Sequence, residues 1–149
     1  MLKKNIIFLS LILFLANCGF TPIYLKNTDV NFSIDQVNYT GDRELNNFLK
    51  INLDQYKNKK VNNKIIINVK TIYNKIILTK DSAGKITNYQ LEAEVVFLIK
   101  STNKKINFTE RKIMTSIDDK FEEATYERSV KQSFASSMSN KLISKLIID

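Results

Sequence analysis

The residue with the clearest chemical potential in this chain of 149 residues is its only cysteine, Cys18, which ends the stretch LANC and is followed by GFTPIY. A lone cysteine cannot form an internal disulfide, so the stability of the fold must come from its hydrophobic core. The thiol can be a buried apolar group or a site of covalent modification. A core position is hard to arrange directly after an apolar N-terminal run, so the position favours modification.

The other reactive side chains give little support for catalysis. The sequence has no histidine, and its 15 Asp and Glu residues show neither a metal-binding nor a paired-carboxylate spacing. Residues 79–85, TKDSAGK, lack the two spaced glycines and the strand-to-helix context of a phosphate-binding loop, so we interpret them as a hairpin turn. We expect the protein not to be an enzyme and to bind no metal and no separate cofactor.

The segment before Cys18 has the features of a secretory signal. Lys3 and Lys4 form a positive region, and residues 6–16 are an apolar run shorter than the ~20 residues that a membrane span needs. We therefore expect residues 1–17 to be a signal peptide that is removed. A short membrane anchor and a buried helix are the alternatives.

Leu15, Ala16 and Cys18 form a pattern that resembles the lipobox of bacterial lipoproteins, although Asn17 stands where that motif usually has Gly, Ala or Ser. In that motif the thiol is alkylated with a diacylglyceryl group, and cleavage then makes the cysteine the new N-terminus. The resemblance implies a covalent lipid on Cys18 and a chain held at a membrane by acyl groups. Gly19 permits export to the outer membrane, because it is an Asp at this position that retains lipoproteins of enteric bacteria at the inner membrane.

The remaining residues, 18–149, carry 21 Lys and Arg against 15 Asp and Glu, a net charge of +6. They suffice for a single α+β domain, which we assign to residues 30–149 after a lipidated tether of residues 18–29. A basic domain can serve an anionic lipid, a nucleic acid or an acidic partner, and export excludes nucleic acid. The charge supports an anionic ligand only weakly, because the abundance of Lys, Ile and Asn is typical of AT-rich codons.

The first part of the domain predicts a strand and then a helix. Residues 30–39 alternate apolar and polar side chains with a slip at Asp35 and Gln36, which indicates a strand with a bulge. Asp42 is a suitable N-cap for residues 43–56, where apolar residues recur at helical spacing.

Three further strands follow along the chain. Residues 65–80 are rich in β-branched side chains, residues 80–85 form a turn, and residues 86–100 alternate between apolar and polar side chains. Residues 101–105 turn the chain into a fourth strand, residues 106–117. Its apolar positions are Ile106, Phe108, Ile113 and Ile117, and we expect a slip near residues 110–112 because these positions change parity there.

The last segment predicts one long helix over residues 120–147, with an N-cap among residues 116–119. Acidic residues occupy its first turns and lysines its last turns, which is the order that the helix dipole favours. We expect its apolar stripe to pack on the sheet of the same chain rather than on a partner. The stripe consists of Val130, Phe134, Met138, Leu142 and Leu146, with Ala135 and Ile143 beside it.

These elements predict an α+β fold in the order βαβββα. The sheet should be a single, mostly antiparallel four-stranded sheet with both helices packed on one face. The other face should stay partly exposed, and the open edges need either charged protection or a partner.

The lipobox with residues 18–24, the βαβββα order and the C-terminal stretch FASSMSNKLISKLI resemble the lipopolysaccharide-assembly lipoprotein family, LptE, in its alphaproteobacterial form. Phe20, Pro22 and Tyr24 favour an ordered, extended tether after the anchor. The resemblance implies a lipid-anchored protein on the periplasmic face of the outer membrane. It also implies that the protein plugs and helps assemble the translocon barrel LptD, and that its partners are LptD, lipopolysaccharide and the membrane.

If the protein handles this anionic glycolipid, lysines at strand ends are the candidate binding residues, because ammonium groups suit phosphates and lysine stems cover acyl chains. The candidates are Lys80 and Lys85 at one turn and Lys104 and Lys105 at the next. The sequence leaves open whether the two pairs share one end of the sheet, and solvation or edge protection is their ordinary role. A subunit of another envelope lipid transporter and a structural envelope lipoprotein are the alternative functions.

Overall fold

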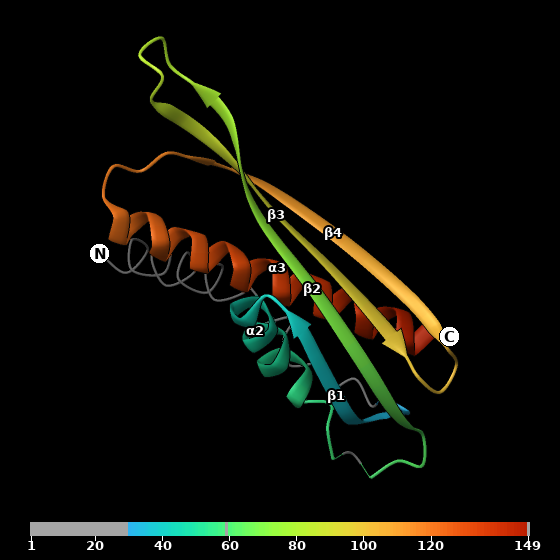
Figure 1. Cartoon of the computed structure of the whole chain (residues 1–149). Helices are drawn as coiled ribbons and strands as arrows, with labels where there is room; N and C mark the ends of the chain where they lie inside the picture. Colours follow the sequence, from blue (N-terminus) through green and yellow to red (C-terminus); the bar gives the residue numbers. More distant parts are fainter. Residues whose placement is uncertain (1–29, 59, 149) are drawn as a thin grey trace, which may run out of the picture.

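The computed structural model of the chain describes residues 30–58 and 60–148 (Figure 1). The predicted signal peptide, the lipidated Cys18 and the tether up to residue 29 lie outside these residues. Those three assignments therefore stay predictions.

The described residues form one four-stranded sheet and two helices. The strand order in the sheet is β1-β2-β3-β4; β1 and β2 are parallel, and the two other pairs are antiparallel. The elements are β1 (Ser33–Gly41), α2 (Arg43–Asp54), β2 (Lys64–Lys80), β3 (Ile86–Ile99), β4 (Lys104–Thr115) and α3 (Lys120–Ile148). The predicted α+β class, the βαβββα order and the mostly antiparallel sheet are confirmed.

The β1–α2–β2 unit is a parallel crossover, and its local features follow from its sequence. The β1–β2 register shifts between Ile34 and Gln36, which confirms the predicted bulge. Asp42 is the N-cap of α2, because its side chain accepts a hydrogen bond from the Leu45 amide at 2.7 Å. The helix buries Leu45, Leu49 and Leu53 beneath the sheet.

The hairpin between β2 and β3 turns where the sequence predicts. Asp81 makes the turn, since its side chain accepts hydrogen bonds from the amides of Ala83 at 2.9 Å and Lys85 at 2.8 Å. Gly84 follows with a φ of 81°. The turn joins two antiparallel strands, so residues 79–85 are a hairpin turn as expected. In Figure 1 this hairpin extends well beyond both helices.

The predicted slip in β4 is wrong. β3 and β4 pair without a register shift from Asn88 opposite Thr115 to Ile99 opposite Lys104. Ile113 consequently faces away from the helices and is 65% exposed, while the core position goes to Met114, which is 1% exposed.

The continuous register of β4 is possible because α3 provides partners for polar side chains on the helix side. Lys141 of α3 forms an ion pair with Glu110 at 2.7 Å. The ammonium group of Lys112 lies 5.5 Å from the ring centroid of Tyr126. Polar residues on the buried side of a strand made the sequence pattern look like a slip.

Helix α3 covers the sheet along most of its length (Figure 1). Asp119 caps it by accepting hydrogen bonds from the amides of Phe121 at 2.8 Å and Glu122 at 3.0 Å. The predicted stripe is confirmed as core: Val130, Phe134, Ala135, Met138, Leu142 and Ile143 are buried, and Leu146 packs against them. Both helices therefore lie on one face of the sheet and leave the other face open.

Candidate functional site

The open face of the sheet holds a groove. The groove has a volume of about 640 Å³ and crosses all four strands. Its lining residues are Asn38, Thr40, Asn68, Val69, Lys70, Ile72, Glu94, Val96, Leu98, Lys100 and Lys105. Because α2 and α3 lie on the opposite face, no helix of residues 30–58 and 60–148 covers this groove.

The floor of the groove is apolar and its rim is cationic. Cross-strand neighbours place Val96 opposite Lys70, and Leu98 opposite Lys105. Val96 and Leu98 are half-buried, whereas Lys70, Lys100 and Lys105 are exposed. Lysines at such positions can lay their stems over an apolar floor and keep their ammonium groups in water.

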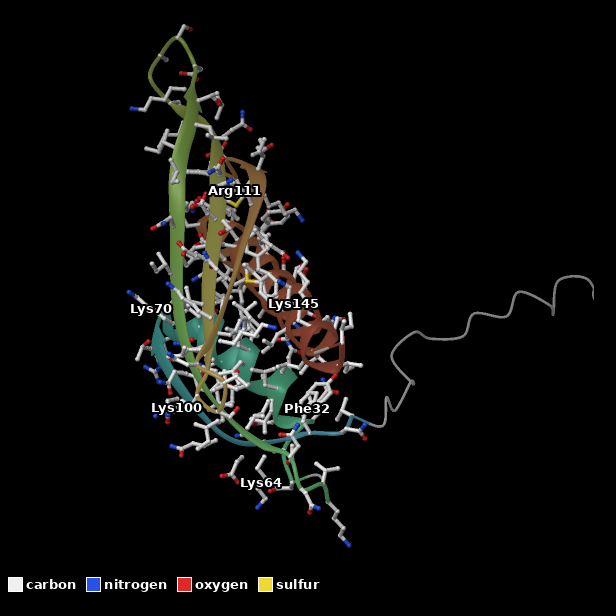
Figure 2. The ribbon with its side chains drawn as sticks, turned by 90° about the vertical axis from the view of Figure 1, so that its right-hand side faces the viewer. Phe32, Lys64, Lys70, Lys100, Arg111 and Lys145 are labelled. Atoms are coloured by element: carbon white, nitrogen blue, oxygen red, sulfur yellow. The ribbon has the colours of Figure 1, made fainter. Side chains whose placement is uncertain are left out.

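Figure 2 shows the arrangement from the side. Lys70 and Lys100 lie along the sheet, and Lys145 lies on α3. Lys145 has a different environment, since its ammonium group lies 5.5 Å from the ring centroid of Phe108. The groove lysines therefore form a group of their own on the open face.

Polar side chains on the open face are mostly paired with each other. The Asn38 amide donates a hydrogen bond to the Asn68 side chain at 2.9 Å. Asn107 donates to Glu94 at 3.2 Å, and Arg111 pairs with Glu92. Because Glu92 and Glu94 already have side-chain partners on the sheet, the rim lysines supply most of the charge that is left to contact a ligand.

The four lysines predicted from the sequence lie at opposite ends of the sheet. Lys80 and Lys85 lie at the β2–β3 turn, and Lys104 and Lys105 begin β4 at the far end of β3. Lys85 forms an exposed ion pair with Asp118 at 2.8 Å, and this hydrogen bond raises the pKa of Lys85. Of the four, Lys105 lines the groove.

Sequence reasoning missed Lys70 and Lys100 as members of this group. The signal was present in the alternation of β2, because Lys70 interrupts an apolar strand at a position facing away from the core residue Val69. Lys100 directly follows the core residue Ile99 at the end of β3. Strand alternation gives the face of each residue, but only the β2–β3 register brings Lys70 and Lys100 to one groove.

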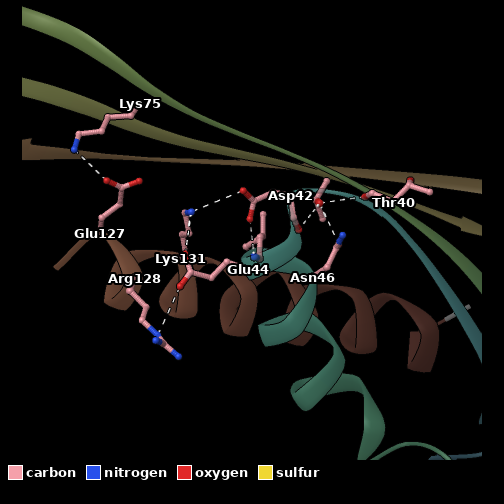
Figure 3. Close-up of polar contacts among 10 residues, drawn as sticks. Thr40, Asp42, Glu44, Asn46, Lys75, Glu127, Arg128 and Lys131 are labelled. Atoms are coloured by element: carbon pink, nitrogen blue, oxygen red, sulfur yellow. Dashed lines mark hydrogen bonds and ion pairs between the residues drawn. The ribbon is translucent and has the colours of Figure 1, made fainter. Parts of the chain in front are cut away.

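The helix side of the sheet carries a network of ion pairs (Figure 3). Lys131, which is 9% exposed, pairs with Glu44 at 3.0 Å and with Asp42 at 3.7 Å. Arg128 contacts Glu44 at 3.6 Å. The network joins the start of α2 to the middle of α3, and it therefore fixes the helix layer rather than forming a reaction centre.

Lys75 of β2 connects the same helix layer to the sheet. It pairs with Glu127 at 3.0 Å and with Glu123. Burial lowers the pKa of Lys75, but the hydrogen bonds to the two carboxylates outweigh burial and the pKa is raised. The hydrogen bonds from Lys120 and then Lys75 lower the pKa of Glu123, which is 5% exposed. Lys75 and Glu123 are therefore charged at neutral pH, and the contacts of Lys75 with the two carboxylates are structural ion pairs.

Neither a metal centre nor a transmembrane helix is found in the described part of the chain. No group of three or more His, Cys, Asp or Glu side chains in residues 30–58 and 60–148 could hold a metal ion. In the same residues, every helix is too short or too polar to cross a bilayer. The expectation of a non-enzymatic protein stays a prediction.

Comparison with solved structures shows which proteins share the fold. The chain resembles rare lipoprotein B from Shewanella oneidensis, with a TM-score of 0.54 and 10% identity over 75% of this chain and 93% of that one. It also resembles a minor lipoprotein from Acinetobacter baumannii, with a TM-score of 0.51 and 17% identity over 74% and 94%. An uncharacterized lipoprotein B from Nitrosomonas europaea gives a TM-score of 0.53 and 16% identity over 79% and 86%.

These three structures define the class of fold: a small α+β fold found in bacterial lipoproteins. At the sequence level, no protein-family model and no curated protein matches the chain. The likeness is therefore one of fold.

Proposed function

We propose that the chain is an envelope lipoprotein of the LptE type, anchored by acyl groups on Cys18 at the periplasmic face of the outer membrane. In this role it binds and plugs the translocon barrel LptD, supports its assembly and helps deliver lipopolysaccharide to the cell surface. The observation that carries the proposal is the βαβββα fold shared with rare lipoprotein B and the minor lipoprotein. The LANC motif and the following GFTPIY element support it from the sequence.

The open face of the sheet suits the handling of lipopolysaccharide. An acylated, phosphorylated glycolipid has apolar chains and anionic groups, which match the apolar floor and cationic rim of the groove. Lys70, Lys100 and Lys105 would face the phosphates, while Val96 and Leu98 would contact acyl chains. Lys80, Lys85 and Lys104 remain predicted contacts at the strand ends.

Binding inside a barrel is consistent with a small protein that has a closed helix side and an open sheet side. Such a partner would be held by contacts spread over many residues rather than by a few catalytic groups. The assembled barrel would depend on this chain, because an interface of that kind is lost when the smaller partner is absent.

The same groove also favours a second candidate function, the lipoprotein subunit of another envelope lipid transporter. Its apolar floor and lysine rim would suit any anionic lipid. That function shares the anchor and the open face but requires no barrel partner. A purely structural envelope lipoprotein would require neither the groove nor the lysines.

Crosslinking followed by purification from native membranes distinguishes these functions. We expect a large outer-membrane barrel to copurify in stoichiometric amount, and depletion of the chain to lower both assembled barrel and surface lipopolysaccharide. A copurifying transporter complex with normal barrel assembly would replace the proposal with the second candidate. Mass spectrometry of the mature N-terminus tests the anchor, which requires an acylated Cys18.

A further inference from the structure

Half of β2 has no neighbouring strand on one side among residues 30–58 and 60–148. β1 pairs with β2 only as far as Gly41 opposite Thr71, whereas β2 continues to Lys80. In the described part of the chain, residues 72–77 of β2 pair with β3 alone. Figure 1 shows this part of β2 as a border of the sheet, beyond the end of β1. We call residues 72–77 the β2 edge.

Hydrogen bonds on either side of β2 show which backbone groups point outward. The Thr71 carbonyl accepts a hydrogen bond from the Asp42 amide at 3.4 Å, so it points to the β1 side. The Ile66 carbonyl accepts from the Lys100 amide at 2.9 Å, so it points to the β3 side. Since backbone groups alternate along a strand, odd-numbered residues of β2 point away from β3.

This alternation continues through the whole β2 edge, because the β2–β3 register has no shift between Ile67 and Ile77. The N–H and C=O groups of Tyr73, Lys75 and Ile77 consequently face the free side. They form a short ladder of donors and acceptors at the spacing that an added strand requires.

The side chains of the β2 edge lack the usual protection against strand addition. Ile72 is 41% exposed, Ile76 is 42% exposed and Ile77 is 48% exposed. Lys75 is the single charged residue of the edge, and Glu123 and Glu127 already neutralise it. The opposite edge, β4, is protected by Lys104, Lys105, Glu110, Arg111 and Lys112.

The β2 edge has defined ends. The register shifts between Ile77 and Thr79, which places a bulge at Leu78 and interrupts the ladder there. Lys80 follows the bulge, and Lys70 precedes the edge on the open face. No carboxylate occurs in β2, so the strand itself supplies positive charge at both ends of the edge. The nearest carboxylates already have partners: Asp42 pairs with Lys131, and Asp81 accepts hydrogen bonds from the Ala83 and Lys85 amides.

We propose that the β2 edge is a docking site for an extended segment of another protein, which adds to the four-stranded sheet as a further strand. The segment is apolar at alternate positions, where it meets Ile72 and Ile76, and acidic at its ends, where it meets Lys70 and Lys80. Backbone hydrogen bonds to Tyr73, Lys75 and Ile77 hold it, as in other cases of strand addition. This inference does not depend on the identity of the barrel partner or on lipid binding in the groove.

A labelled peptide tests the proposal directly. The probe is fluorescein-labelled Glu-Val-Thr-Val-Thr-Val-Glu, added to the full chain purified in detergent and followed by fluorescence anisotropy and amide hydrogen exchange. We expect saturable binding and slower exchange at the amides of Tyr73, Lys75 and Ile77. The same peptide with its first threonine, at position 3, replaced by proline should bind at least about tenfold more weakly, because it cannot continue the ladder.

Two exposed isoleucines in one row of the sheet provide a matched pair of variants. Ile76 and Ile113 both lie beside Gln90 on the open face, one on the β2 edge and one on β4. Ile76→Lys should weaken peptide binding about tenfold, and Ile113→Lys by less than about twofold. Ile77→Pro, which removes an outward N–H, should also weaken binding, with folding checked by circular dichroism.

Three results would overturn the proposal. Absence of saturable binding would remove the docking site, and equal losses in Ile76→Lys and Ile113→Lys would show general adhesion to apolar surface. Concentration-dependent protection of the same amides without peptide would assign the edge to a second copy of this chain instead.

Discussion

The two faces of the sheet differ in how far their side chains are buried and in how their charges are paired. The helix side buries Leu91, Ala93, Val95 and Phe97 of β3 completely. It also surrounds its few charges with opposite charges, as with Lys131 and Glu44. On the open side, Val96 and Leu98 of the same strand stay half-buried beside exposed lysines. The alternate residues of this one strand are divided between a packed core and an exposed groove, so changes on the two faces should have different consequences.

The largest effect on stability is expected in the helix-side core. Phe134→Ala or Leu142→Ala should lower the free energy of unfolding by about 3 kcal/mol, because each leaves a cavity where a side chain at most 4% exposed was packed. Urea denaturation measures the change. Ile147→Ala, at a position 50% exposed, is the control and should cost less than about 0.5 kcal/mol. Similar losses for the core and control variants would contradict the packing described.

A second large effect is expected where β1 turns into α2. Gly41 has a φ of 98°, and a Cβ placed there would lie 1.8 Å from the Thr71 carbonyl oxygen. Gly41→Ala should therefore destabilise the protein by about 2 kcal/mol or more. Gly84→Ala is the matched control, because its φ is 81° but nothing lies near its Cβ position. A smaller thermal shift for Gly41→Ala than for Gly84→Ala would argue against this close approach.

The ion pairs of the helix side predict a specific dependence on pH. Lys120 and Lys75 lower the pKa of Glu123, so its charge stabilises the folded state above the unfolded pKa of about 4.3. That contribution is lost as the pH falls through the lower folded pKa. Glu123→Gln should lower the free energy of unfolding at neutral pH. It should also make that free energy fall less steeply as the pH is lowered into the acid range. The exposed neighbour Glu122, changed to Gln, should cost less stability at neutral pH than Glu123→Gln. An equal loss in the two variants would reject the assignment.

The smallest effect on stability, and the clearest effect on binding, is expected on the open face. Replacing Lys70, Lys100 and Lys105 by Glu should weaken binding of lipopolysaccharide, more so at low salt, while the unfolding midpoint changes little. Lys80→Glu with Lys85→Glu, at the distant hairpin turn, is the comparison variant and should weaken binding less, because these two lysines lie outside the groove lining. A binding assay in which the turn variant loses as much affinity as the groove variant would show that the groove has no special role.

Much of the fold could be predicted from local patterns. The β1 bulge, the Asp42 cap and the α3 stripe depend on neighbours in sequence, and all three are confirmed. The β4 slip was predicted wrongly because the partners of Glu110 and Lys112 come from α3, which is remote in sequence. A strand pattern cannot show that a distant helix will make polar residues acceptable on the buried side.

The candidate site could be predicted only in part, for a related reason. Lys80, Lys85, Lys104 and Lys105 were selected by their position at turns, which the sequence shows directly. Which of them meet depends on strand length: β3 separates the two pairs, and the register instead brings Lys105 to Lys70 and Lys100. Register is set by pairing over the whole sheet, so the sequence of a single strand does not predict it.

Photo-crosslinking in living cells tests the division between the two faces most directly. A photoreactive residue at Leu98, in the groove, should give adducts with lipopolysaccharide, and the chain should copurify with its barrel. The same photoreactive amino acid introduced in place of Ser133, which is exposed on α3, should give no lipopolysaccharide adduct. Equal adducts at both positions, or adducts only at Ser133, would contradict the assignment of binding to the open face.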